Sequence, residues 1–311
     1  MRIWEKIIFH FAGKEMFSST IIPTINRSTL SRAVCSVLNQ SFKAADFEVI
    51  VVNDSGRPLP DTDWQHSDRV RVIDTNRRER SVARNTGAAI AKGKYLHFLD
   101  DDDWLLPGAL EAFWILDKLK GNESVWLYGS YQTVDNDDNL VERIHPSVYG
   151  NIFALVVAGE GIPFQVSLLK AEQFHIIGGF DPNPSIIGVE DRDVGRRMAL
   201  HGAVAYIPAV VARIRIGEIN STTNWATIAE SDRQGREKVL SAQNAFARLN
   251  TSVNSSYWHG RVSRAYFASA VWNLKRRDIL TAINRITVGL AFSGKHTFSA
   301  KFWDGLSDKV R

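Results

Sequence analysis

Hydrophobic positions in the first hundred residues alternate between short apolar runs and helical repeats. The runs predict buried strands over residues 19–23, 48–52, 70–73 and 95–99. Between them, apolar residues recur at helical spacing over 30–38 and 81–92, and we expect Ser81 to cap the second helix and Gly93 to close it. This strand–helix order predicts an α/β fold, an open and mainly parallel sheet with helices on both faces.

The rest of the chain is first irregular and then helical. The middle holds strand candidates over 125–131, 165–169 and 204–207, and a helix that begins at Glu190. Apolar residues return at helical spacing over 258–271 and 279–290. We therefore expect an N-terminal extension over 1–17, an α/β domain over 18–225 with halves 18–107 and 108–225, and a helical C-terminal extension over 226–311.

Composition narrows the class of protein. Of the 311 residues, 44% are hydrophobic and 23% are charged, which is typical of a globular chain. The net charge of +4 suits an anionic ligand or an acidic membrane surface, but it is too small and too dispersed to indicate nucleic-acid binding. The single Cys35 cannot form an internal disulfide. No stretch approaches the roughly 20 apolar residues of a membrane span, and the first residues do not resemble a signal peptide, so we expect a cytoplasmic protein.

Three polar clusters follow predicted strands, at residues 23–27, 53–56 and 100–103. Open parallel sheets bind ligands beyond the carboxyl ends of their strands, so these clusters are candidates for one ligand site.

The third cluster is four consecutive aspartates after the strand that ends at Leu99. Such a run is electrostatically costly unless a cation or solvent offsets it. Mg²⁺ and Mn²⁺ take oxygen ligands, and Mg²⁺ typically combines one or two carboxylates with substrate phosphates. The alternative, which the sequence leaves open, is a solvated acidic turn at the start of a helix.

The other candidates also have two readings. Asp54 lies in a sequence that makes a good turn without any function. Arg84 could bind phosphate through its planar fork or form a surface ion pair. Glu190 and Asp191 begin a helix, where a carboxylate could act as a general base or simply interact with the helix dipole.

Together, in order and spacing, these clusters resemble the family 2 glycosyltransferases, which are inverting enzymes of the GT-A fold. The resemblance covers roughly residues 18–223, and the matching stretches are 21–27, 51–56, 83–87, 98–107, 178–181 and 190–191. It implies that the fold is of the GT-A type; the C-terminal helical extension, expected from its periodicity alone, lies outside the resemblance.

The resemblance also implies roles for particular residues. Those at the nucleotide would be Thr24, Asn26, Asp54, Arg84, Asp100 and Asp101, with Asp54 recognising the base edge. Asp100 and Asp102 would form the Asp-x-Asp pair that holds Mn²⁺ or Mg²⁺, with Asp102 favoured as the direct ligand. Asp191 would be the general base that deprotonates the acceptor hydroxyl, with Glu190 beside it.

The chain departs from the family pattern at two places. Asn53 stands where the family often has aspartate. No histidine occurs over 213–220, where many members carry one, which leaves a third metal ligand unassigned. We expect Arg213 or Arg215 to contact the diphosphate instead.

The resemblance therefore implies metal-assisted transfer of a sugar, most simply from a UDP-sugar, to a glycan or glycolipid acceptor in polysaccharide or glycoconjugate synthesis. The basic and aromatic residues over 256–290 suit peripheral contact with the inner face of a membrane, whereas packing on the catalytic domain is the alternative. Two other functions stay open: a sugar nucleotidylyltransferase, which usually has a glycine-rich loop where 23–26 has none, and a non-catalytic binder of nucleotide sugars.

Overall fold

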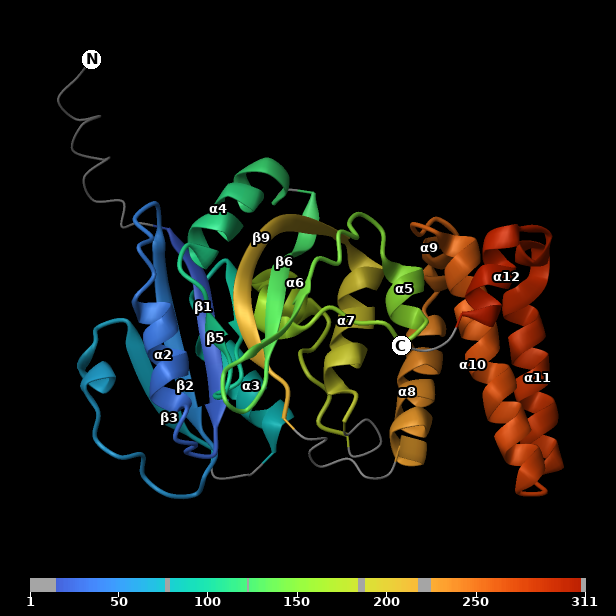
Figure 1. The fold of residues 1–311 in the computed structure, drawn as a ribbon, viewed down its shortest axis with the longest axis horizontal. Coiled ribbons are helices and arrows are strands. Elements are labelled where there is room, and N and C mark those ends of the chain that lie inside the picture. The colour runs from blue at the N-terminus through green and yellow to red at the C-terminus, as the bar shows by residue number, and fades with distance from the viewer. Residues whose placement is uncertain (1–14, 76–78, 122, 184–187, 218–224, 309–311) are drawn as a thin grey trace, which may run out of the picture. The chain divides into compact units, whose positions relative to one another are not determined.

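The computed structural model describes residues 15–75, 79–121, 123–183, 188–217 and 225–308, and these form two compact units (Figure 1). The first unit takes in the chain up to 147 together with 163–182 and 205–221. The second takes in 148–162, 183–204 and the chain from 222 onward, so it holds more than the helical extension expected over 226–311. The domain limits inferred from the sequence stay a prediction, and most of the expected extension over 1–17 lies outside the described residues.

Within the described residues, nine strands form one sheet in the order β3-β2-β1-β4-β8-β6-β9-β5, with β7 paired to β6. Their bounds are β1 Met16–Thr24, β2 Asp46–Asn53, β3 Val70–Asp74, β4 Tyr95–Phe98, β5 Trp104–Leu105, β6 Ser124–Val134, β7 Leu140–Ile144, β8 Ser167–Lys170 and β9 Ala203–Arg215. The mixed α/β fold confirms the predicted fold class.

The part of the sheet built from the first hundred residues is parallel. Strand β1 pairs parallel with β2 and β4, and β2 with β3, as the alternating pattern predicts. The later strands pair antiparallel: β8 with β4 and β6, β7 with β6, and β9 with β5. The sheet is therefore mixed. Strand β9 is much longer than the expected 204–207. The sequence pattern did not reveal its full length, because much of the strand is only half-buried and its apolar pattern is interrupted.

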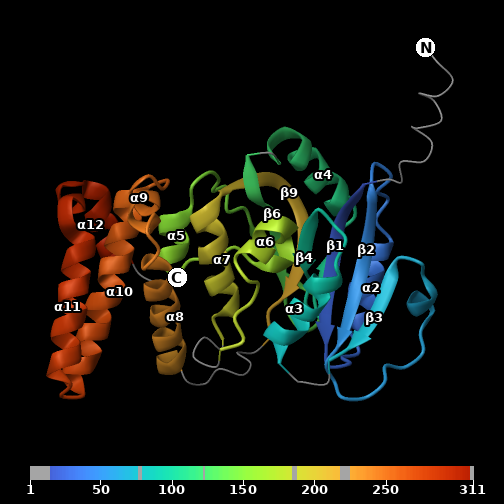
Figure 2. The same cartoon turned by 180° about the vertical axis from the view of Figure 1, so that it is seen from behind.

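The helices of the first unit are α2 Leu30–Leu38, α3 Arg80–Ile90, α4 Ala109–Lys120 and α6 Ala171–Ile176, with short 3-10 turns at Asp63–His66 and Phe164–Val166. Figure 2 shows α3 beside the parallel strands. Gly87 permits this close approach, because a Cβ there would lie 2.5 Å from a methyl carbon of Ile21. Glu79, rather than the expected Ser81, caps α3 by accepting hydrogen bonds from the backbone N–H groups of Ser81 and Val82.

The second unit is helical, and its helices are α5 Phe153–Val157, α7 Glu190–His201, α8 Trp225–Leu240, α9 Ala245–Asn250, α10 Ser255–Lys275, α11 Ile279–Ser293 and α12 Ala300–Ser307, with a 3-10 turn at Gly294–Phe298. Helices α10 and α11 match the two predicted C-terminal helices and form a hairpin (Figure 1). Inside this unit Asp232 pairs with Arg196 at 2.5 Å and with Arg236 at 2.7 Å. Among the described residues, no helix has both the length and the apolar character needed to cross a membrane.

Candidate active site

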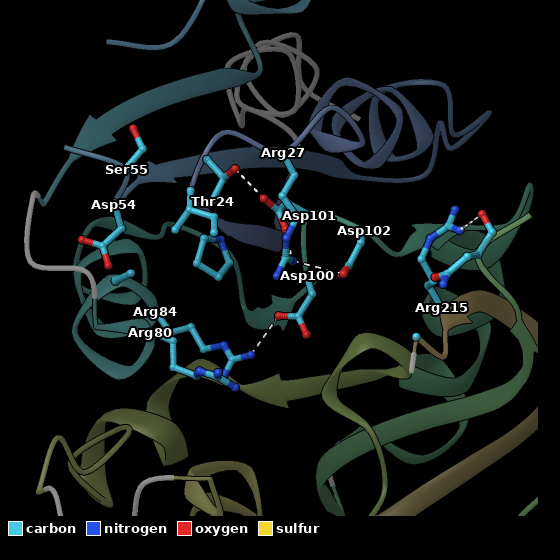
Figure 3. A pocket seen from close by; sticks show the side chains of 15 residues that line it. Thr24, Arg27, Asp54, Ser55, Arg80, Arg84, Asp100, Asp101, Asp102 and Arg215 are labelled. Atoms are coloured by element: carbon cyan, nitrogen blue, oxygen red, sulfur yellow. Dashed lines mark hydrogen bonds and ion pairs between the residues drawn. The ribbon is translucent and has the colours of Figure 1, made fainter. Parts of the chain in front are cut away.

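A cavity of about 790 Å³ opens in the first unit, where β1, β2 and β4 end (Figure 3). Its described lining residues come from these strand ends, from the first turn of α3, from the β6–β7 turn and from the end of β9. They are Pro23, Thr24, Ile25, Arg27, Asp54, Ser55, Arg80, Ala83, Arg84, Asp100, Asp101, Asp102, Asn136, Arg215 and Gly217. The ligand site expected beyond the strand ends is thus a real cavity.

The four aspartates divide into two groups. Asp101 is buried and accepts hydrogen bonds from Thr24 Oγ1 at 2.5 Å and from Arg27 Nη1 at 2.8 Å. Its carboxylate therefore fastens the β1 loop to the acidic turn. The other three, Asp100, Asp102 and Asp103, offer one oxygen each within 4.8 Å of one another, so they form a carboxylate triad.

Protein partners orient the triad. Asp100 accepts from Arg84 Nη2 and from Gln165 Nε2, both at 2.8 Å. Asp103 is buried and accepts from the backbone N–H of Arg215 at 2.7 Å. Hard oxygen donors at this spacing fit a divalent cation such as Mg²⁺ or Mn²⁺.

The electrostatics of the triad also favour a cation. Burial, together with the neighbouring charge of Asp100, raises the pKa of Asp103 well above its usual value. Burial likewise raises the pKa of Asp102, with Arg27 opposing the shift. Burial acts in the same direction on Asp100, but the Arg84 guanidinium outweighs it and lowers the pKa of that carboxyl. Burial thus penalises the charged form of all three carboxyls, and a bound cation would offset that cost.

The predicted nucleotide residues of β1 and β2 lie at the cavity, with one exception. Thr24 and Asp54 are buried at adjacent strand ends, joined by a hydrogen bond from the Asp54 N–H to the Thr24 carbonyl. The Asp54 carboxylate accepts from Thr75 Oγ1 and from the Glu79 N–H, both at 2.6 Å. Asn26 does not line the cavity; it is exposed in a left-handed turn, with a φ of 69°, and its N–H donates to Thr24 Oγ1.

Two arginines of α3 reach the cavity. Arg84 is buried, its guanidinium bonded to Asp100 and 5.2 Å from the Phe180 ring. Arg80, which the sequence did not single out, lies one turn earlier on the same helix and is exposed. Figure 3 shows the two side chains together below the acidic turn.

The two arginines expected at the diphosphate have different positions. Arg213 donates through Nε to Gln132 at 2.9 Å and does not line the cavity. Arg215 lines it, but its guanidinium donates to the carbonyls of Asp135 and Asn136 and pairs with Asp138. Arg215 therefore holds the β6–β7 turn.

Glu190 and Asp191 begin α7, which belongs to the second unit. Glu190 is buried and Asp191 half-buried, so the two neighbours differ in exposure as expected of adjacent helix positions. Their roles stay predictions.

Sequence reasoning missed Asp103 as a member of the triad, as well as Gln165, Arg80 and Asn136. The sequence did contain a signal for Asp103, because it belongs to the run of four aspartates. In the structure its N–H bonds to the Asp100 carbonyl, and this tight turn brings the two carboxylates together. Gln165 gave no signal, because it reaches the site through antiparallel pairing of β8 with the distant strands β4 and β6. Asn136 gave none either, because its place depends on the contact of Arg215 with the turn of the β6–β7 hairpin.

Comparison with known proteins gives relatives with the same kind of domain. TarP, the poly(ribitol-phosphate) beta-N-acetylglucosaminyltransferase of Staphylococcus aureus, is 31% identical over 158 residues, which cover 49% of this chain and 47% of TarP. The GalNAc(5)-diNAcBac-PP-undecaprenol beta-1,3-glucosyltransferase of Campylobacter jejuni is 36% identical over 101 residues, covering 30% of this chain and 32% of that enzyme. The chain thus spans about half the length of TarP.

A crystal structure of TarS from S. aureus, in complex with UDP-GlcNAc, has a similar fold. The TM-score is 0.62 with 14% sequence identity, and the match covers 88% of this chain and 90% of that one. The family model of glycosyl transferase family 2 matches residues 19–171, which include β1 to β4, the acidic turn and Gln165. Through these residues the chain belongs to glycosyl transferase family 2.

Proposed function

We propose that this protein transfers a sugar from a UDP-sugar to a hydroxyl of a glycan or glycolipid acceptor, with inversion at the anomeric carbon and with the help of Mn²⁺ or Mg²⁺. One observation carries the proposal: the carboxylate triad and the strand-end residues Thr24 and Asp54 line or adjoin a single cavity. The volume of that cavity lies in the range of small-molecule and cofactor sites.

The relatives support the donor and the acceptor class. TarS was crystallised with UDP-GlcNAc, and TarP is named for transfer of N-acetylglucosamine to a poly(ribitol-phosphate). By analogy with them, we propose a uridine diphosphate donor and an acceptor that becomes part of a cell-surface polysaccharide or glycoconjugate. We also propose that the transfer takes place in the cytoplasm, at the inner face of the membrane. The sugar itself is left open.

Asp54 would read the nucleotide base. Thr75 and the Glu79 N–H fix its carboxylate at the end of β2, and a carboxylate is an acceptor with room for several hydrogen bonds. Uracil and thymine present a ring N–H that such a group can accept. Thr24, at the adjacent strand end, would contact the ribose.

Asp100, Asp102 and Asp103 would hold the cation. When bound, it would neutralise the diphosphate as the bond to the anomeric carbon breaks. Arg84 and Gln165 keep Asp100 in place, and Arg80 supplies a further positive charge beside the expected diphosphate. Asp191 would take the proton of the acceptor hydroxyl, which is the step that in-line displacement requires.

The test is a panel of UDP-, TDP-, GDP- and CDP-sugars, each with Mn²⁺ or with a chelator, followed by release of the nucleoside diphosphate. We expect release from UDP-sugars first and TDP-sugars second, and none in chelator. Asp54→Asn should weaken UDP binding more than it weakens metal binding. Activity restricted to GDP- or CDP-sugars would remove the base-reading role of Asp54.

Two controls separate the competing functions. A nucleotidylyltransferase would instead produce pyrophosphate from a nucleoside triphosphate and a sugar phosphate. A pure binder would bind the donor without releasing any product. Proton NMR of a transferred sugar would show whether the anomeric configuration inverts.

A further inference from the structure

Helix α11 has an exposed apolar stripe that its packing does not explain. Its members recur at helical spacing and are Ile279, Leu280, Ile283, Ile286 and Leu290, with exposed fractions of 59%, 83%, 55%, 39% and 58%. A different side of the helix meets α10: Ala282 and Gly289 are buried, and a Cβ at Gly289 would lie 2.6 Å from the Phe267 ring. The stripe is therefore additional to the face that holds the hairpin together.

The charges at the two ends of this stripe are mainly positive. All residues of α11 are described, and none is an aspartate or glutamate. Three exposed cations, Lys275, Arg276 and Arg277, precede the helix, and the exposed Lys295 follows it. Asp278 lies between them, and its carboxylate caps α11 by accepting from the Thr281 N–H at 3.1 Å.

We propose that α11 lies on an anionic lipid surface, with its apolar stripe in the boundary between headgroups and acyl chains and its flanking cations on the phosphates. An exposed apolar face between basic ends is the pattern of helices that bind in the plane of a membrane. Each cation near an anionic surface contributes a favourable electrostatic interaction that salt weakens.

Charge complementarity favours lipid over a second copy of the chain. If two α11 helices packed along their stripes, either orientation would bring basic ends together: like ends in a parallel pair, and Lys275–Arg277 against Lys295 in an antiparallel one. Helix α11 carries no acidic residue, and Asp278, the carboxylate between its basic ends, is already bonded to the Thr281 N–H as the helix cap, which leaves little to offset that repulsion. An anionic bilayer offsets it directly.

The residues that would contact the membrane differ from those that the sequence suggested. Aromatic residues of α10 were expected at the membrane, but Tyr266 is 1% exposed and stacks on Phe292, so it belongs to the core of the second unit. The aliphatic residues of α11 take the exposed positions instead. The proposal does not depend on the catalytic proposal, because it concerns binding and not turnover.

The experiment is flotation of the full chain with two kinds of vesicle, phosphatidylcholine alone and phosphatidylcholine mixed in equal parts with phosphatidylglycerol. We expect binding to the mixed vesicles only, and loss of that binding in high salt. Ile283→Asp should reduce binding at least tenfold. The double variant Arg276→Glu with Arg277→Glu should reduce it on the order of tenfold or more.

Matched variants isolate the effect of position. Ile176→Asp places the same charge at an apolar residue of α6 that is 66% exposed, and Lys43→Glu with Arg143→Glu makes the same change in net charge on the first unit. Both should bind mixed vesicles like the unchanged protein. Circular dichroism should show all variants folded.

Three results would overturn the proposal. The first is equal binding to both kinds of vesicle. The second is weakening by the control variants as large as that by the α11 variants. The third is that Ile283→Asp lowers the mass of the protein in solution, measured by light scattering, and leaves vesicle binding unchanged. That result would show that the stripe contacts a second copy of the chain. Loss of vesicle binding with UDP-sugar turnover in solution intact would leave the catalytic proposal untouched.

Discussion

The backbone N–H of Arg215 donates to Oδ1 of Asp103 at 2.7 Å, while the side chain of the same arginine donates hydrogen bonds to carbonyls of the β6–β7 turn. One residue at the end of β9 thus contacts the carboxylate triad with its main chain and the rim of the cavity with its guanidinium. The Arg32 guanidinium, 3.8 Å from the Trp104 ring, pairs with Asp138 of the same turn at 2.7 Å. Asn136, whose carbonyl Arg215 holds, is therefore fixed where it lines the cavity.

Arg215→Ala should separate the two contacts. The backbone N–H survives, so Mn²⁺ affinity measured by calorimetry should stay close to that of the unchanged protein. Loss of the guanidinium frees the turn, which should lower the free energy of unfolding by about 1–3 kcal/mol. It should also raise the donor KM on the order of tenfold, the equivalent of about 1.4 kcal/mol. Arg213→Ala is the control and should leave the KM unchanged, because Arg213 does not line the cavity and contacts Gln132 and the Trp104 ring instead.

The triad predicts that Asp103 matters as much as Asp102 for the metal. Asp102→Asn and Asp103→Asn should each weaken Mn²⁺ binding by about 10–100-fold or more, because each removes a charged oxygen donor. Asp101→Asn is the matched change within the same run, and its carboxylate is occupied by Thr24 and Arg27. It should alter stability or donor KM and spare Mn²⁺ affinity. Equal loss of Mn²⁺ binding in all three variants would contradict the assignment of Asp102 and Asp103, but not Asp101, to the metal site.

The general base is tested by two neighbouring substitutions. Asp191→Asn keeps size and loses basicity, so it should bind UDP-sugar nearly normally and turn over about 10²–10⁴ times more slowly. Glu190→Gln should have a much smaller effect. If the two outcomes were exchanged, the motif would be right and the residue wrong. Normal turnover in both variants would remove α7 from the chemistry.

His97 gives the fold a pH dependence. Burial lowers its pKa from 6.5 to about 4, and the neutral ring, protonated on Nε2, donates to the Gln165 carbonyl and accepts from Thr20 Oγ1. Because the unfolded chain binds the proton more readily, stability is full above pH 6.5 and falls as the pH drops from there toward 4. The loss should reach about 2 kcal/mol at pH 5.

Urea unfolding at pH 7 and pH 5 measures this loss. His97→Asn, which cannot titrate, should show a smaller difference between the two pH values by about that amount. His259, whose pKa burial also lowers to about 4, contributes in the same window and is present in both proteins, so the comparison cancels it. If the two proteins had an identical pH dependence, the loss of stability at low pH would come from groups other than His97.

The sequence predicts the parallel half of this fold well because each strand and its neighbouring helix carry their own local pattern. The strand-end rule then predicts that Thr24, Asp54 and the acidic turn meet, and Thr24, Asp54 and the first three aspartates of the turn line one cavity. The sequence could not predict that Asp103 joins the carboxylate triad while Asp101 bonds to Thr24 and Arg27, because this depends on the geometry of a four-residue turn. Gln165 precedes β8 and Arg215 ends β9, and both strands join the sheet by long-range antiparallel pairing, for which a single sequence gives no register. The place of Asn136 depends in turn on Arg215, which holds its carbonyl.

Among the described residues that line the cavity, four aspartates face four arginines: Asp54, Asp100, Asp101 and Asp102 against Arg27, Arg80, Arg84 and Arg215. The charges of the lining therefore balance, and Asp103 adds a further carboxylate beside them, so the cavity is not a basic cleft that draws free phosphates from a distance. A UDP-sugar that arrives already complexed to a divalent cation is nearly neutral as well. Capture of the donor should then depend on ionic strength far less than steered association does. An enzyme of this kind would keep a steady rate while the salt around it changes, and it would discriminate by fit at short range.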